Sequence, residues 1–114
     1  MTQGIQTFLY PVKDGARAKS FYSKLLGIEP HSNEPYYIGF KVGDQEIGLV
    51  PNGHSAGLTA PIGYVHVADI RETLQSLLDS GAKLEQEMKN VGGGRLIASV
   101  KDADGNVIGL LQSA

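Results

Sequence analysis

Three polar side chains near residue 105 have the spacing of either a cation-binding loop or a turn. Asp102, Asp104 and Asn106 alternate around Gly105 in the stretch KDADGNVIGLLQ, residues 101–112. A calcium loop needs six or more oxygen ligands and normally a downstream bidentate glutamate, and none follows in the sequence. The stretch instead suits a type I turn followed by a left-handed glycine, which is a three-residue hairpin loop. We therefore interpret these residues as a turn.

The three histidines lie far apart in the sequence and form no i, i+4 pair, so they are a weak indication of a metal site. His66 lies in an expected strand, on the face that we expect a helix to cover, and we interpret it as a core residue. His31 follows Pro30 near a strand end, and we expect it to face solvent. His54 is the histidine that could reach a cleft, and a plain loop residue is the alternative.

Arg95 follows the glycine-rich stretch VGGG, residues 91–94, and its guanidinium could bind a carboxylate or phosphate through two hydrogen bonds. A solvated arginine at a strand end is the alternative. The glycines lack the strand–loop–helix setting of a phosphate-binding loop. Ser99 has no histidine expected beside it, and no two carboxylates share a cleft-facing position. No catalytic residue is therefore assigned.

The composition predicts one soluble globular domain over residues 1–114, with 41% hydrophobic and 19% charged residues. A net charge of −2 without a basic cluster argues against a nucleic-acid partner. Apolar runs are only a few residues long, so no membrane segment is expected. The absence of cysteine excludes a disulfide framework and a thiol nucleophile. With no signal-peptide pattern, a cytoplasmic location is the default expectation.

The first half predicts a strand followed by a helix. The strand spans 4–12, and its period of two places Thr7 and Leu9 on the face opposite the helix. Asp14 is the expected helix cap, and Gly27 suits the left-handed position that ends a helix. The side chains expected to form the buried stripe are Ala18, Phe21, Tyr22 and Leu25.

The same order recurs over residues 64–82. Asp69 is the second cap, Glu72 completes a capping box and Gly81 ends the helix. The two caps lie 55 residues apart, which indicates a duplicated unit. The expected buried stripe is Ile70, Leu74, Leu77 and Leu78.

Each helix is followed by strand patterns, and two short turns set their pairing. Gly43-Asp44 reads as a two-residue hairpin, which places Lys41 opposite Glu46. By the same count Tyr37 lies opposite Val50, and Gly39 opposite Gly48. The three-residue loop pairs Ser99 with Gly109. The further strands are expected at 28–31, 36–42, 46–50, 83–87, 95–101 and 106–112.

The result is an α+β chain with the order βαβββ twice. Module 1 spans 1–50, a crossing loop rich in glycine, proline and serine spans 51–61, and module 2 spans 62–114. The paired modules, FYSKLLG at 21–27 and DADGNVIGLLQ at 102–112, resemble the vicinal oxygen chelate superfamily. That superfamily includes glyoxalase I, bleomycin-resistance proteins, extradiol dioxygenases and fosfomycin-resistance enzymes. The resemblance implies a glyoxalase/bleomycin-resistance-type fold with a concave cleft and, by analogy with short relatives, a homodimer.

In metal-dependent members, the resemblance implies a divalent cation held by His, Gln or Glu from four strands. Counted from the motifs, the matching positions here are Thr7, Gly48, Gly63 and Gly109. One threonine and three glycines do not provide the nitrogen and oxygen donors that Ni, Zn, Mn or Fe require. We therefore expect no metal and no other cofactor.

These observations predict a glyoxalase/bleomycin-resistance-like protein that lacks the superfamily metal ligands and binds a small organic molecule in its cleft. It would act by sequestration or by an unassigned reaction, so enzyme activity is left open. The first alternative is a glyoxalase-like lyase or dioxygenase with a displaced divalent-metal site, and the second is a non-catalytic interaction module. The expected ligand-binding residues are Thr7, Leu9, Tyr37, Val50, His54, Val65, Arg95 and Ser99.

Overall fold

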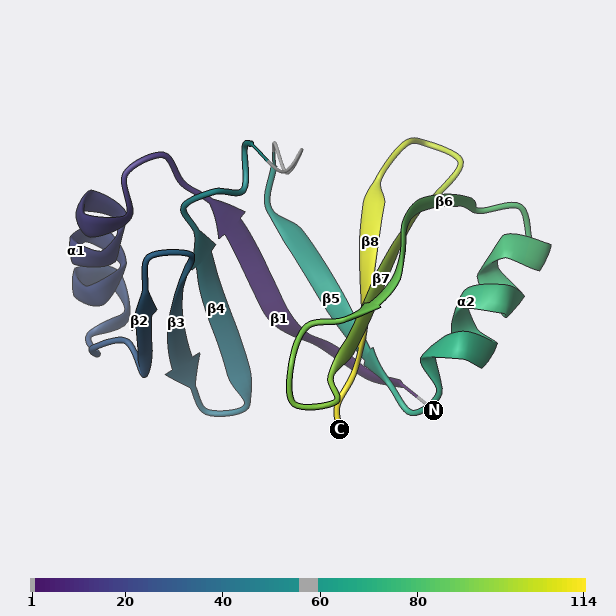
Figure 1. Ribbon diagram of the computed structural model, residues 1–114, viewed down its shortest axis with the longest axis horizontal. Coiled ribbons are helices and arrows are strands. Elements are labelled where there is room, and N and C mark those ends of the chain that lie inside the picture. Colours follow the sequence, from purple (N-terminus) through teal and green to yellow (C-terminus); the bar gives the residue numbers. More distant parts are fainter. Residues whose placement is uncertain (1, 56–59) are drawn as a thin grey trace. The chain divides into compact units, whose positions relative to one another are not determined.

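The computed structural model describes residues 2–55 and 60–114, which contain the order βαβββ twice (Figure 1). The chain divides into two compact units. The first unit holds the described residues of 7–61, and the second holds those of 1–6 and 62–114. The expected α+β architecture of two tandem modules is confirmed. No helix in the described part of the chain is long and apolar enough to cross a bilayer.

The first unit is a four-stranded sheet with one helix. The strand order is β2-β3-β4-β1, with β1 parallel to β4 and the other pairs antiparallel. The Asp14 carboxylate accepts a hydrogen bond from the Arg17 backbone N–H at 3.1 Å, and Gly27 ends the helix with φ 70°. Both expected helix ends are confirmed. The elements are β1 (Thr2–Pro11), α1 (Gly15–Leu26), β2 (Ser32–Glu34), β3 (Tyr37–Val42) and β4 (Gln45–Val50).

The second unit repeats this plan. Its strand order is β5-β8-β7-β6, with β5 parallel to β8. The Asp69 carboxylate accepts from the Glu72 backbone N–H at 3.1 Å, and Gly81 follows the helix with φ 105°. In each unit the strand before the helix is therefore parallel to the last strand of the module. The elements are β5 (Ile62–Val67), α2 (Ile70–Asp79), β6 (Lys83–Asn90), β7 (Leu96–Lys101) and β8 (Val107–Gln112).

Each helix packs on one face of its sheet, which we call the helix-covered face; the opposite face is called the open face. In the first unit the helix-covered core is formed by Ile38, Phe40 and Leu49. Ala18, Tyr22 and Leu26 pack against it from α1. Phe21 and Leu25, expected in the buried stripe, are 61% and 65% exposed. The expectation was wrong for these two because the stripe follows 18, 22 and 26, about 100° of helix rotation away from them.

In the second unit the core is formed by Ile70, Ala98 and Leu110. Leu74 and Leu77 pack against it, as the expected stripe requires. Among the further expected strands, the one placed at 28–31 was wrong, because β2 begins at Ser32. Pro30 has no backbone N–H to donate. Pairing with β3 therefore begins with the His31 N–H, which donates to the Gly39 carbonyl at 2.9 Å.

Both short turns form as predicted. Lys41 pairs with Glu46 and Gly39 with Gly48 across the first hairpin. In the second, Ser99 pairs with Gly109, which confirms the three-residue loop.

The acidic stretch at 102–106 is a turn. The Asp102 carboxylate accepts from the Asp104 and Asn106 backbone N–H groups, both at 2.9 Å, and from the Asn106 side chain at 3.0 Å. Gly105 has φ 85°, the left-handed conformation that the loop needs. The Asn106 side-chain hydrogen bond, together with these backbone bonds, lowers the pKa of Asp102.

Candidate functional site

The open face of the first unit carries most of the polar side chains that we expected in a site. The β1–β4 register places Thr7 beside Glu46 and Leu9 beside Gly48. Alternation along β3 and β4 then puts Tyr37 on the same face, since Ile38 and Leu49 pack toward the helix. The expected site residues Thr7, Leu9, Tyr37 and Val50 therefore share one face of one sheet.

The Tyr37 ring covers two glycines on this face. A Cβ atom added to Gly48 would lie 2.6 Å from both Cε1 and Oη of Tyr37 and 2.6 Å from Cδ2 of Leu9. A Cβ on Gly39 would lie 2.7 Å from Cε2 of Tyr37. Such separations are far below a carbon–carbon contact distance. The ring therefore occupies the space into which a metal-binding side chain at position 48 would extend.

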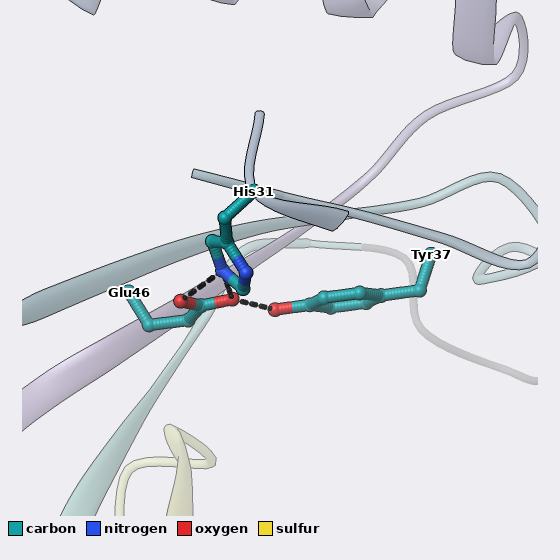
Figure 2. A network of polar contacts seen from close by, with 3 residues as sticks. All are labelled: His31, Tyr37 and Glu46. Carbon is teal, nitrogen blue, oxygen red and sulfur yellow. Dashed lines mark hydrogen bonds and ion pairs between the residues drawn. The ribbon is translucent and has the colours of Figure 1, made fainter. Parts of the chain in front are cut away.

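Next to this ring lies a polar cluster that we call the Glu46 cluster, formed by His31, Tyr37 and Glu46. Figure 2 shows the carboxylate between the imidazole and the phenol. The Tyr37 hydroxyl donates a short hydrogen bond to Oε2 of Glu46. Nε2 of His31 lies 2.8 Å from Oε1 and 3.0 Å from Oε2 of the same carboxylate. The cluster brings together side chains from β3, β4 and the segment before β2.

All three side chains of the Glu46 cluster lie directly over Gly39. A Cβ there would lie 2.5 Å from Oε2 of Glu46 and 3.0 Å from Nε2 of His31. The absence of a side chain at this position is therefore what lets the three groups meet. The Glu46 side chain is 21% exposed and that of His31 is 48% exposed. The carboxylate is thus partly covered while the imidazole remains open to solvent.

Sequence reasoning missed this cluster. His31 was expected to face solvent, and it is indeed half-exposed, but its ring is bound to Glu46. Glu46 was expected opposite Lys41, and the register is correct, yet its carboxylate bonds to His31 and Tyr37. The hairpin register could have placed Glu46 on the face of Tyr37. No sequence signal could have placed His31, since it precedes the strand.

The open face of the second unit repeats the ring-over-glycine arrangement. Tyr64 pairs with Gly109, and Gly109 pairs with Ser99. A Cβ on Gly109 would lie 2.5 Å from Cδ1 of Tyr64. The ring therefore fills the space of a side chain at the second position where metal-dependent relatives place a ligand. Burial raises the pKa of the Tyr64 hydroxyl. Ser99 is only 3% exposed.

Two expectations on β5 were wrong. Val65, expected on the open face, packs against the helix-covered core of Ile70, Ala98 and Leu110. His66, expected in the core, alternates with Val65 and lies on the open face, in register with Leu111. The error arose because Tyr64 and His66 are amphipathic, so the alternation along this strand carries little polarity contrast.

Because the faces of β5 are exchanged, the expected metal-ligand position on this strand is Ile62 instead of Gly63. Gly63 shares its face with Val65, the helix-covered one, so the open-face residue is Ile62. Ile62 precedes Asp69 by seven residues, as Thr7 precedes Asp14. An isoleucine cannot bind a metal either. In the described ranges 2–55 and 60–114, no group of three or more His, Asp or Glu side chains is placed to hold a metal ion. The residues described at these four positions do not fit the divalent cation that the resemblance implies.

Arg95 lies next to the open face of the second unit, at the end of the β6–β7 loop. Its backbone N–H donates to the Gly92 carbonyl at 3.1 Å, and its carbonyl accepts from Val91 at 2.9 Å. Burial, and then the positive charge of Arg95, lower the pKa of His66. His54 is exposed in the turn after β4. The roles of Arg95 and His54 in ligand binding stay predictions.

Solved structures of low sequence identity share the fold. A Vibrio splendidus glyoxalase/bleomycin resistance protein/dioxygenase superfamily member has a TM-score of 0.73 and 17% identity, covering 99% of this chain and 100% of its own. Methylmalonyl-CoA epimerase from Mycobacterium tuberculosis has a TM-score of 0.74 and 19% identity, covering 99% and 89%. A Legionella pneumophila chain described as NAD-dependent benzaldehyde dehydrogenase has a TM-score of 0.75 and 17% identity, covering 95% and 98%. At these identities the likeness concerns the fold alone.

No curated protein matches this chain in sequence. A family model does match, and it spans both units, from residue 4 to residue 110. The match agrees with the tandem βαβββ modules and with the hairpin motif around Gly105. The chain therefore belongs to the Glyoxalase/Bleomycin resistance protein/Dioxygenase superfamily.

Proposed function

We propose that this superfamily member binds a small organic molecule on the open face of one of its units, without a metal ion at the family's ligand positions. The observation that carries the proposal is the pair of tyrosine rings, Tyr37 over Gly48 and Tyr64 over Gly109. Each ring fills the space of a potential metal ligand with an aromatic group. The remaining two positions, Thr7 and Ile62, offer one hydroxyl and one aliphatic side chain.

The chemistry of the open faces supports an organic ligand. Small-molecule sites are mainly apolar and aromatic, with a few fixed polar groups that orient the ligand. The first unit combines Leu9, Val50 and the Tyr37 ring with the polar Glu46 cluster. In the second unit His66 is the partly exposed polar group on this face, and Tyr64 and Ser99 beside it are buried.

Metal analysis tests the metal-free part of the proposal. Protein purified without chelators should contain Ni, Zn, Mn and Fe only far below one equivalent per chain, as measured by inductively coupled plasma mass spectrometry. Dialysis against each metal, followed by gel filtration, is the loading control. One tightly held equivalent would contradict the proposal and favour a glyoxalase-like lyase or dioxygenase with a displaced metal site.

A thermal-shift screen of metabolites and antibiotics tests the binding part. A ligand present at 100 times its dissociation constant stabilises the folded state by about 2.7 kcal/mol, which raises the melting temperature by roughly 10 °C in a domain of this size. The shift should persist in EDTA, since no metal is involved. No reproducible shift across the screen would instead favour a non-catalytic interaction module.

A further inference from the structure

We infer that His31 is the proton acceptor for a weakly acidic small molecule, a phenol or an enol, bound on the open face of the first unit. This inference rests on the proposed function and specifies the chemical class of the ligand. It follows from the hydrogen bonds of the Glu46 cluster, the exposure of its imidazole and the apolar surface beside it.

The hydrogen bonds of Glu46 fix the tautomer of His31. An ionised carboxylate only accepts hydrogen bonds, so the Nε2 atom that faces both of its oxygens must carry a proton. In the neutral ring Nδ1 is then the unprotonated nitrogen and accepts a hydrogen bond. When Nδ1 takes a proton, Nε2 keeps its hydrogen bonds to the Glu46 carboxylate.

The cluster is held in place before any ligand arrives. The Tyr37 hydroxyl bonds to the same carboxylate from the other side, and Gly39 supports all three groups. Glu46 lies on a strand paired on both sides, with β3 and with β1. The imidazole is therefore the exposed end of a fixed hydrogen-bonded chain, with 48% of its side chain accessible.

The proton transfer balances without a further reactant. The ligand O–H bond breaks, its electron pair stays on oxygen, and the proton forms a bond to Nδ1. The imidazolium then faces the Glu46 carboxylate as an ion pair. The other charged side chains that the register places on this face are Lys41, opposite Glu46, and Glu34, opposite Tyr37. Lys41 is exposed, and it is the positively charged side chain that this register places beside Glu46.

The surface beside the imidazole favours a flat ligand. Two positions without side chains, Gly39 and Gly48, are covered by the Tyr37 ring, and Leu9 borders the same ring at Gly48. A planar ring system can lie against the partly exposed Tyr37 ring while its hydroxyl reaches His31. Phenols and enols join such a planar body to an O–H group that can donate its proton to an imidazole, and electron-withdrawing substituents bring the O–H pKa toward that of the imidazole.

The test uses para-nitrophenol, whose anion absorbs at longer wavelength than the neutral phenol, at a pH below its own pKa. The shape control is para-nitroanisole, which has no acidic proton. With the wild-type chain we expect a phenolate difference spectrum that saturates with protein, and affinity for the phenol at least about tenfold above that for the ether, the scale of one hydrogen bond to a charged group.

The variants assign the proton acceptor. His31→Asn should abolish the phenolate spectrum, and Glu46→Gln should reduce it several-fold, because the imidazolium loses its counter-charge. Glu87→Gln, a glutamate on exposed β6, is the matched control and should behave as wild type. Tyr37→Phe keeps the ring over Gly48 but removes one bond to Glu46, and should give an intermediate loss. Circular dichroism melts establish that each variant is folded.

The outcomes separate this inference from the proposed function. Equal binding of the phenol and the ether without a phenolate spectrum would overturn the inference and leave small-molecule binding intact. A phenolate spectrum that survives in His31→Asn would also overturn it. Binding of neither probe would overturn it as well, while the thermal-shift screen decides the proposed function independently.

Discussion

At the scale of single residues, the glycines under the tyrosine rings carry the strongest physical constraint. A methyl group on Gly109 would meet the Tyr64 ring at 2.5 Å, so the ring or the strand must shift. Gly109→Ala should lower the free energy of unfolding by about 2 kcal/mol, the usual cost of overpacking a buried site. Urea denaturation measures this. In a Tyr64→Leu background the same substitution should cost much less, and additive losses would contradict the contact.

His66 and Arg95 give a pH prediction at the same scale. The pKa of His66 is lowered by burial and by Arg95, so the folded state binds its proton less readily than the unfolded chain. Neutral His66 is therefore compatible with the full stability of the fold above the pKa that His66 has in the unfolded chain. That stability is lost as the pH falls from the unfolded pKa toward the lower pKa of the folded state. Arg95→Ala should therefore raise the pKa of His66, as measured by NMR titration of its ring protons. An unchanged titration would mean that the two side chains are not neighbours.

Asp102 gives a second pH prediction. Its pKa is lowered by bonds to Asn106 and to the backbone of the turn. The stabilisation is present above the unfolded pKa and is lost as the pH falls through the folded pKa. Melting temperatures of wild type and Asp102→Ala should therefore differ at neutral pH and converge in acid. Asp104→Ala is the matched control and should follow wild type throughout.

At the scale of elements, the two faces of α1 can be distinguished by substitution. Leu26 packs against the core of Ile38, Phe40 and Leu49, whereas Leu25 is largely exposed. Leu26→Ala should lower the free energy of unfolding by about 2 kcal/mol, and Leu25→Ala by about 0.5 kcal/mol or less. Chemical denaturation of the two variants gives the comparison. Similar losses in the free energy of unfolding would mean that Leu25 is buried against a second subunit.

Local chemistry explains which elements could be predicted. Asp14, Asp69 and the glycines after each helix set helix ends through bonds that span only a few residues. The hairpin turns likewise set the pairs Gly39–Gly48 and Ser99–Gly109. Val65 and His66 on β5 were assigned to the wrong faces because apolar and amphipathic residues alternate along this strand, so the two faces differ little in polarity. The Glu46 cluster was missed because His31 reaches it from a segment outside the strands, which no periodicity describes.

At the scale of the whole molecule, the expected homodimer is still a prediction. One chain has a mass of 12.1 kDa, so light scattering coupled to gel filtration should give about twice that value. Phe21 and Leu25 on α1 are exposed, so substituting them tests whether this helix lies in the dimer interface without disturbing the core. A monomer at micromolar concentration would contradict the prediction.

The rings over Gly48 and Gly109 also restrict how this lineage could evolve. A carboxylate cannot enter either position while Tyr37 or Tyr64 remains, because even a Cβ atom collides with the ring. A metal ligand at either position therefore takes two substitutions, and the tyrosine has to change first. Replacing Tyr37 also removes a hydrogen bond from Glu46. A sequence with only the first of these substitutions has lost the tyrosine ring and has not yet gained a carboxylate.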